Sequence, residues 1–287
     1  MFSIPLAWLQ LSREKIRLLI ALAGIGFAVI LMFMQLGFQA ALYDSATRLH
    51  QSLQADLVLI SSRSKSLAFM RTFSWRRLYQ TLSFDGVESI SSIYVGFQDW
   101  KNPYKGNLRA IYIYGFEPVK SLFNLPGVSE NLDQLKVKEN ILFDRASRQE
   151  YGPIATDFEQ GKPIITELGD KRVNVVGLFS LGPSFGADGN VIMSDLNFFR
   201  IFPNRKIGEI DIGLIQLKPN AEAKAILKNI ESSLPKDIRV FTHQGFVNFE
   251  KNYWKTSTAI GFIFTLGVGM GFIVGTVIVY QILYTDV

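Results

Sequence analysis

Two long runs without a charged side chain stand near the ends of this chain. The first, 18–42, consists mostly of Leu, Ile, Val, Phe, Met and Ala, and the second covers 256–284. At a helical rise of about 1.5 Å per residue, each is long enough to cross a hydrocarbon layer of about 30 Å. We therefore predict a transmembrane helix over each run, the first uncleaved because it is longer than the core of a signal peptide.

Between these runs, 43–255 has the composition of an ordinary folded domain. It is large enough to bury its own core in one or two lobes. Period-2 alternation rich in Ile, Val and Tyr predicts strands, and helical spacing of apolar residues predicts helices between them. The strands are expected at 55–61, 87–98, 109–116, 140–144, 163–168, 171–179, 191–193, 209–217 and 238–241, and the helices at 73–84, 118–125, 146–151, 195–202 and 221–234.

The domain is expected to join the membrane through two helical stalks. After the first span, 39–54 keeps a helical pattern. From Gln244 onward, a helix is predicted to run straight into the second span. The predicted fold class is therefore a membrane α+β protein, in which two transmembrane helices flank a large two-lobed α+β domain. Such stalks suit the transmission of movement.

The segment before the first span, 1–17, predicts a short amphipathic helix in the cytoplasmic interface. It has Ser3 as a cap, Pro5 in the first turn, Trp8 on an apolar face and its charges late. The alternative is an N-terminal extension of the span itself.

Charge at the ends of the spans predicts the orientation. Arg13, Lys15 and Arg17 precede the first span, whereas Asp44 follows it. The excess of cations on the N-terminal side places the N-terminus in the cytoplasm and the domain in the periplasm. The last residues, 285–287, would then be cytoplasmic. Two lysines before the second span oppose this assignment, but the first span usually sets the orientation.

Aromatic side chains mark the expected membrane interfaces. Tyr43 follows the first span, and Tyr253 and Trp254 precede the second. Amphipathic rings concentrate at headgroup depth, so these three residues predict one shared interface, with Trp8 at the opposite one.

Glycines recur every four residues in the second span, at Gly267, Gly271 and Gly275. This spacing places them on one helix face, where another helix can approach closely. The face is expected to contact a partner subunit or sister helices. Packing against the first span of the same chain is an equal alternative.

Overall composition excludes several classes of function. The net charge is +5 and the pI about 9.3, but no dense cluster of Lys and Arg with interleaved aromatics predicts nucleic-acid binding. The absence of cysteine excludes disulfides and thiolate metal sites. No cofactor or metal is expected. A phosphate-binding loop of the form G-x-x-x-x-G-K-[ST] is also absent, so any ATPase is a separate subunit.

Enzymatic chemistry has one candidate motif. Residues 182–186, Gly-Pro-Ser-Phe-Gly, match G-x-S-x-G, with His243 downstream. The nucleophile elbow needs a helix directly after Ser184, and the following glycines and Asn190 disfavour one. We therefore predict a non-catalytic chain. His50 and His243 lack the spacing of a metal site and are interpreted as surface or stalk residues.

Several sequence blocks resemble DevC-type permeases of cyanobacteria, within the FtsX/MacB-like group of ABC transporter membrane subunits. The resemblance covers essentially the whole chain. Its blocks are PLAWLQLSREKIRLLIALAGI (5–25), MFMQLGFQAAL (32–42), LHQSLQADLVLIS (49–61), RRLYQ (76–80), GVES (86–89) and YQILYTDV (280–287).

The resemblance implies a mechanism and a set of partners. Two permease subunits would pair, each with a DevA-like ATPase. Their periplasmic domains would meet a DevB-like, HlyD-type adaptor that reaches a TolC-like outer-membrane channel, and a lipid or glycolipid would be exported. Such permeases have two further spans, so the chain is expected to be a fragment or a truncated product.

Two other functions share this layout. A signalling receptor could hold a sensor domain between two spans, and a HAMP-like or coiled-coil output segment after Val287 would distinguish it. An FtsX-like regulator of cell-wall hydrolases would have a hydrolase partner and no adaptor.

Overall fold

The computed structural model describes residues 15–284, and they form two compact units. One unit is the folded domain Asp44–Tyr253. The other combines the residues up to Tyr43 with those from Trp254 onward. The expected amphipathic helix over 1–17, with Trp8, and the expected cytoplasmic end 285–287 lie essentially outside the described residues.

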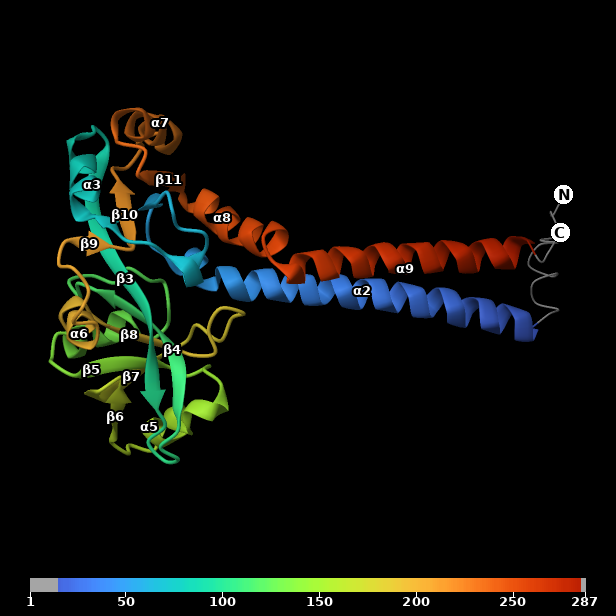
Figure 1. Cartoon of the computed structure of the whole chain (residues 1–287), viewed down its shortest axis with the longest axis horizontal. Helices are drawn as coiled ribbons and strands as arrows, with labels where there is room; N and C mark the ends of the chain where they lie inside the picture. The colour runs from blue at the N-terminus through green and yellow to red at the C-terminus, as the bar shows by residue number, and fades with distance from the viewer. Residues whose placement is uncertain (1–14, 285–287) are drawn as a thin grey trace. The chain divides into compact units, whose positions relative to one another are not determined.

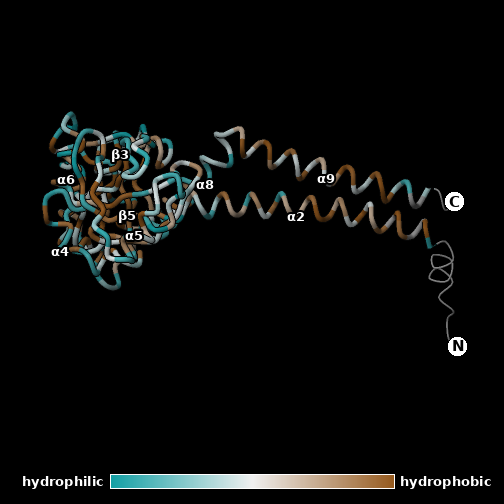
Figure 2. The backbone as a smooth tube through the Cα atoms, turned by 90° about the horizontal axis from the view of Figure 1, so that it is seen from below, coloured by the Kyte–Doolittle hydropathy of each residue, from teal (hydrophilic) through white to brown (hydrophobic). Residues whose placement is uncertain are grey.

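The second unit contains two long apolar helical segments, the part of α2 (Lys15–Ser52) up to Tyr43 and the whole of α9 (Ala259–Tyr284). By length and composition, Leu22–Ser52 and Ala259–Gln281 could each cross a membrane. Their tubes are largely hydrophobic along this length, whereas the folded domain mixes polar and apolar segments (Figure 2). Outward-facing apolar side chains, such as Phe33 at 70% exposure and Phe272 at 68%, have the character of lipid-facing residues.

The predicted continuous helix into the second span is wrong. Helix α8 (His243–Thr256) ends before α9 begins, and Ser257 and Thr258 form a bend between them. Thr258 Oγ1 donates to the carbonyl of Trp254 at 2.8 Å and accepts from the Gly261 amide at 3.4 Å. A Cβ on Gly261 would lie 2.2 Å from the Lys255 carbonyl oxygen. Only glycine at position 261 therefore allows this bend.

A nine-stranded sheet organises the folded domain, in the order β11-β1-β10-β3-β4-β8-β5-β7-β6. A separate pair, β2 and β9, lies beside it. Most pairs are antiparallel, but β4–β8 and β5–β7 are parallel. The strands are β1 Leu57–Ser61, β2 Phe73–Ser74, β3 Val87–Lys101, β4 Leu108–Phe116, β5 Asn140–Asp144, β6 Ile164–Leu168, β7 Lys171–Phe179, β8 Asn190–Ser194, β9 Glu209–Ile210, β10 Ile212–Leu217 and β11 Ile238–Thr242.

The long strand β3 belongs to two lobes (Figure 1). Its first half pairs with β10, and its second half, from Ile93 onward, pairs with β4. Because Trp100 also pairs with Leu168 of β6, the strands β3-β4-β8-β5-β7-β6 close on themselves. The domain therefore has a small closed barrel and an open four-stranded wing that share one strand, which agrees with the predicted two lobes.

Short helices cover the sheet. The α-helices are α3 Trp75–Gln80, α4 Leu132–Leu135, α5 Ile154–Glu159, α6 Asp195–Ile201 and α7 Ala223–Ser233, and the 3₁₀ turns are η1 Leu67–Phe69, η2 Thr81–Ser83, η3 Ser129–Asn131 and η4 Gln149–Tyr151. Helix α7 contributes Ile226 and Ile230 to the wing core, and α6 contributes Phe198 to the barrel core. A third core, around Phe123 and Phe246, joins the ends of α2 and α8 to the sheet.

Four predicted elements differ from the structure. The predicted helix 118–125 is extended, because Phe123 bridges to Leu53 and the Asn124 amide donates to the Ser52 carbonyl at 2.6 Å. The predicted strand 209–217 is split at Asp211, whose carboxylate is buried. The predicted helix 73–84 begins as a strand, and 146–151 contains only a 3₁₀ turn. Tertiary pairing decides the first two cases, and no local pattern signals it.

Candidate functional site

The second span packs against the first through the predicted glycine face. A Cβ on Gly267 would lie 3.0 Å from the Gln35 side chain, and one on Gly271 would lie 2.7 Å from Met32 Cγ. A Cβ on Gly275 would lie 3.7 Å from Ala28 Cβ. The residue numbers of the contacts on the first span fall from 35 to 28 as those of the glycines rise from 267 to 275. The two spans are therefore antiparallel and close. The structure therefore places these glycines against the same chain, the alternative that the sequence left open.

The predicted interface aromatics are largely covered by protein. Tyr43 and Trp254 are each 8% exposed, and Tyr253 is half-buried with its ring 6.1 Å from that of Phe69. A shared aromatic belt at the membrane surface stays a prediction.

A buried histidine and a buried carboxylate bring the end of α2 against the middle of α8 inside the folded domain. His50 is 0% exposed and Glu250 is 2% exposed, and His50 Nε2 lies 3.4 Å from Glu250 Oε2. The His50 ring also packs on Phe246 at 4.5 Å between centroids. The sequence interpretation of His50 as a surface or stalk residue was therefore wrong about its burial. Nothing in the sequence around His50 indicates that the carboxylate of Glu250, 200 residues later, packs beside it.

The same carboxylate positions a loop. Glu250 Oε2 accepts a 2.7 Å hydrogen bond from the Leu67 amide, and the Leu67 carbonyl accepts one of 2.5 Å from Tyr112. One buried carboxylate thus ties α8 to both α2 and the segment 62–72. Loss of a buried hydrogen-bond acceptor leaves its donor unsatisfied and is destabilising, so this carboxylate fixes the geometry of the region.

Asp211 is a buried carboxyl group of the folded domain whose pKa is raised. It is 1% exposed, and burial raises its pKa to about 6, although Arg205 and the Val95 amide oppose the shift. Arg205 forms an ion pair with it. Perturbed pKa values can mark catalytic sites, but here the group completes the turn between β9 and β10 at the edge of β3. We interpret it as structural.

The G-x-S-x-G segment does not form a nucleophile elbow. No helix begins directly after Ser184, since residues 185–190 are not helical, and the Ser184 Oγ accepts hydrogen bonds of 3.2 Å from the Gly186 and Ala187 amides. The loop is held instead by Asp144, which accepts from the Leu181 and Gly182 amides. The serine is therefore used in a local turn.

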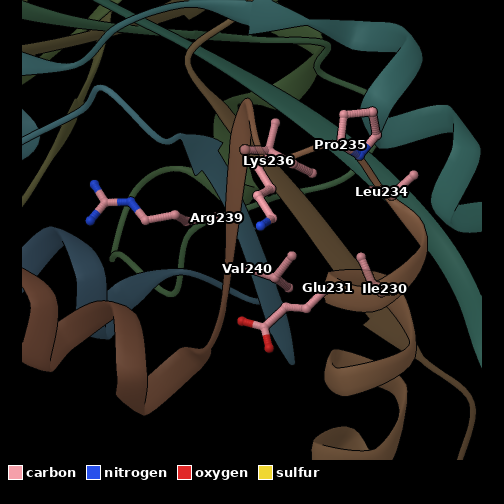
Figure 3. Close-up of a pocket in the computed structure, with 8 residues that line it drawn as sticks. Ile230, Glu231, Leu234, Pro235, Lys236, Arg239 and Val240 are labelled. Atoms are coloured by element: carbon pink, nitrogen blue, oxygen red, sulfur yellow. The ribbon is translucent and has the colours of Figure 1, made fainter.

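A hollow of about 290 Å³ opens between α7 and β11 (Figure 3). Glu231 and Lys236 line this hollow and are exposed to solvent. Arg239 points away from α7 and lies over the Phe249 ring at 4.7 Å. No buried polar group faces this hollow in the described domain, so it has the character of a surface groove. Among residues 15–284, no cluster of three His, Cys, Asp or Glu could hold a metal ion.

Comparison with known proteins gives structural similarities only. No family model matches the sequence, and no curated protein matches it. The periplasmic region of MacB from Actinobacillus actinomycetemcomitans is similar over 71% of this chain and 95% of its own, at 9% identity and a TM-score of 0.47.

Two further solved structures are similar at the same level. The extracellular domain of the noncanonic ABC-type transporter YknZ from Gram-positive bacteria aligns with 66% of this chain and 99% of its own, at 14% identity and a TM-score of 0.42. A domain of a putative permease protein from Porphyromonas gingivalis aligns with 65% and 88%, at 13% identity and a TM-score of 0.41.

Proposed function

We propose that this chain is the membrane permease subunit of an ABC exporter of the DevC type, working by mechanotransmission. A separate ATPase would do work on the cytoplasmic side. The membrane helices would deliver that work to the folded domain in the periplasm. The sequence blocks that resemble DevC-type permeases support this proposal, together with the arrangement of two apolar helices and an α+β domain.

The observation that favours transmission is the unbroken course of α2. The helix contains the first candidate span and continues without interruption to Ser52. Its last turn belongs to the folded domain, where Leu49 is 3% exposed and lies in the core that includes Phe123 and Phe246. Because a helix is stiff along its axis and a packed core is not continuously deformable, movement of this helix would displace the sheet.

The partners and cargo follow from the same proposal. The chain would pair with a second copy and with a DevA-like ATPase, and its domain would meet a DevB-like, HlyD-type adaptor that leads to a TolC-like channel. The sequence resemblance supports a lipid or glycolipid as the exported substrate. Membrane lipid would then be both the surroundings and the source of cargo.

Affinity purification of the tagged full-length protein from its native membranes tests the assembly. The proposal predicts that an ABC ATPase and a HlyD-type adaptor copurify with it. A cell-wall hydrolase without an adaptor would indicate an FtsX-like regulator. Recovery of neither ATPase nor adaptor would contradict the proposal.

A helix-breaking substitution tests transmission separately from assembly. Asp44 is exposed on α2 at the start of the folded domain, and proline there removes a helical hydrogen bond and costs about 3 kcal/mol locally. In the purified complex, Asp44→Pro should keep basal ATPase activity but lose its stimulation by the adaptor. Asp44→Ala, which keeps the helix, should retain both. Equal stimulation in the two variants would rule out α2 as the transmitting element.

A further inference from the structure

The segment 62–72 of the folded domain is a rigidly held loop that displays an aromatic ring. The Ser62 amide donates to the Asp237 carbonyl at 2.9 Å, and Arg239 donates to the Ser64 carbonyl. Leu67 is fixed through both its amide and its carbonyl, as described above. Although these hydrogen bonds hold the loop in place, the Phe69 side chain is 57% exposed to solvent. A single exposed ring is common on protein surfaces, so it marks a contact surface only together with further exposed apolar or charged side chains beside it.

The loop is also strongly cationic. It contains Arg63, Lys65 and Arg71, all exposed, and no acidic residue. Two hydrogen bonds join the two ends of the loop. The Arg71 amide donates to Ser64 Oγ at 3.0 Å, and Ser64 Oγ donates to the Arg71 carbonyl at 3.4 Å. Arg63 and Lys65 flank Ser64 in the chain, so all three cationic residues lie at the hydrogen-bonded ends of the segment that presents Phe69.

A second exposed aromatic stands beside the loop. Phe185, in the segment before β8, is 56% exposed. Its neighbour Gly186 lies against Ala68, because a Cβ on the glycine would be 3.6 Å from the Ala68 Cβ. Two loops far apart in sequence thus present aromatic rings in one region of the folded domain.

The chain itself keeps this region close to the second candidate span. The Phe69 ring lies 6.1 Å from that of Tyr253, and α9 begins at Ala259. Six residues span at most about 20 Å even when fully extended. If α9 crosses the membrane, the loop must lie near the bilayer surface whatever the orientation of the domain.

We propose that the 62–72 loop is a lipid-binding loop of the folded domain. Phe69, with Phe185 beside it, enters the headgroup region of the outer leaflet, and the three cations bind phosphates of anionic lipids. Aromatic rings with neighbouring basic residues are the usual signature of binding at a membrane surface. This inference depends on the two spans, and its placement in the outer leaflet on the proposed orientation, but not on the ABC partners, so failure to find an ATPase would leave it intact.

Site-specific fluorescence tests the insertion directly, because the chain has no native cysteine. Full-length Phe69→Cys carries an environment-sensitive dye and is placed in nanodiscs whose lipids bear quenchers at known depth. Leu196→Cys is the matched control: Leu196 is 75% exposed on α6, on the opposite side of the folded domain from α8 (Figure 1). The label at 69 should be quenched and blue-shifted, and the label at 196 should be neither.

The cationic half of the proposal has its own measurement. Quenching at 69 should increase with the fraction of anionic lipid and decrease in high salt. The triple variant R63Q/K65Q/R71Q should weaken this lipid dependence by up to about fivefold for each charge removed. Quenching that is equal in zwitterionic and anionic discs would overturn the phosphate contact.

Two outcomes would overturn insertion itself. One is a label at 69 that stays as water-exposed as the label at 196. The other is a label at 69 that becomes shielded only when an adaptor protein is added and is never quenched by lipid, which would assign the surface to a protein partner. Phe69 is exposed, so its replacement should leave the fold intact, and a circular dichroism spectrum equal to wild type checks this.

Discussion

His50 Nε2 lies 3.4 Å from Glu250 Oε2 in the interior of the folded domain, and the same carboxylate oxygen accepts the amide hydrogen of Leu67. The three residues come from α2, α8 and the 62–72 loop. Both helices lead toward the candidate spans in sequence. This contact therefore fixes, at one point, the two chain segments that would move the domain and the loop that we assign to the membrane surface.

Replacing Glu250 by alanine should destabilise the folded domain strongly. The substitution leaves the Leu67 amide and the His50 ring buried without their carboxylate. Leaving these buried polar groups unsatisfied costs roughly 3 kcal/mol, which for a domain of this size corresponds to a decrease of about 6–12 °C in melting temperature. Thermal unfolding of the full-length protein in detergent measures it.

Two controls make this result specific. Glu250→Gln keeps an acceptor for the Leu67 amide and should lose about half as much or less. Glu231→Ala removes a solvent-exposed carboxylate and should change stability by less than about 0.5 kcal/mol. Equal melting temperatures for Glu250→Ala and Glu231→Ala would show that the buried pair does not stabilise the domain.

Contact between the spans can be tested by oxidation. The Cβ separation of 3.7 Å between Ala28 and position 275 suits a disulfide, and there is no native cysteine to interfere. The variant A28C/G275C should form an intramolecular disulfide in membranes. Adding Gly271→Leu should greatly reduce its yield, because the new side chain meets Met32 at 2.7 Å from the first added carbon.

Gly269→Leu is the matched control for this experiment. Gly269 lies in the same helix two residues earlier, and a Cβ there would meet nothing within 4 Å. It should leave the disulfide yield unchanged. A covalent dimer as the main product would instead assign the glycine face to a neighbouring subunit, which was the other interpretation of the sequence.

The sequence predicted the spans, most strands and the two lobes, because each leaves a local pattern. Charge-free length identifies α2 and α9, and alternation identifies β3, β4 and β7. The bend at Ser257 and Thr258 was missed because both residues are compatible with a helix, and the bend depends on a close approach of Gly261 to the Lys255 carbonyl.

The candidate site was predicted much less well. Glycine spacing identified the packing face but not the helix that it meets. His50, Glu250 and Leu67 lie on three segments whose meeting depends on the whole sheet, so no spacing could reveal them. The sequence of the 62–72 loop predicts an ordinary polar connection. The exposure of Phe69 in a hydrogen-bonded loop is visible only in the structure.

Asp211 should make stability depend on pH. Burial raises its pKa to about 6 in the folded domain, against an ordinary value of 3.8. The folded state therefore holds this proton more tightly than the unfolded chain, so the free energy of unfolding should fall as pH rises from about 4 to 6. A shift of about two pKa units corresponds to about 3 kcal/mol.

The Asp211→Asn variant isolates this contribution. Asparagine does not titrate and retains an acceptor for the Val95 amide, so the decrease between pH 4 and 7 should be smaller than in wild type by about 3 kcal/mol. Chemical unfolding at several pH values measures the difference. Asp85→Asn, at a fully exposed carboxylate, serves as the control and should behave as wild type. Parallel pH profiles for wild type and Asp211→Asn would contradict the assignment.

We propose that the folded domain lies on the outer side of the membrane while the start of α2 lies inside. Cysteines at Lys136, exposed in the folded domain, and at Lys15, at the start of α2, test it with a membrane-impermeant maleimide on intact spheroplasts. We predict that Lys136→Cys is labelled at once and Lys15→Cys only after the membrane is permeabilised. Labelling of Lys136→Cys only after permeabilisation would place the domain in the cytoplasm and contradict the account.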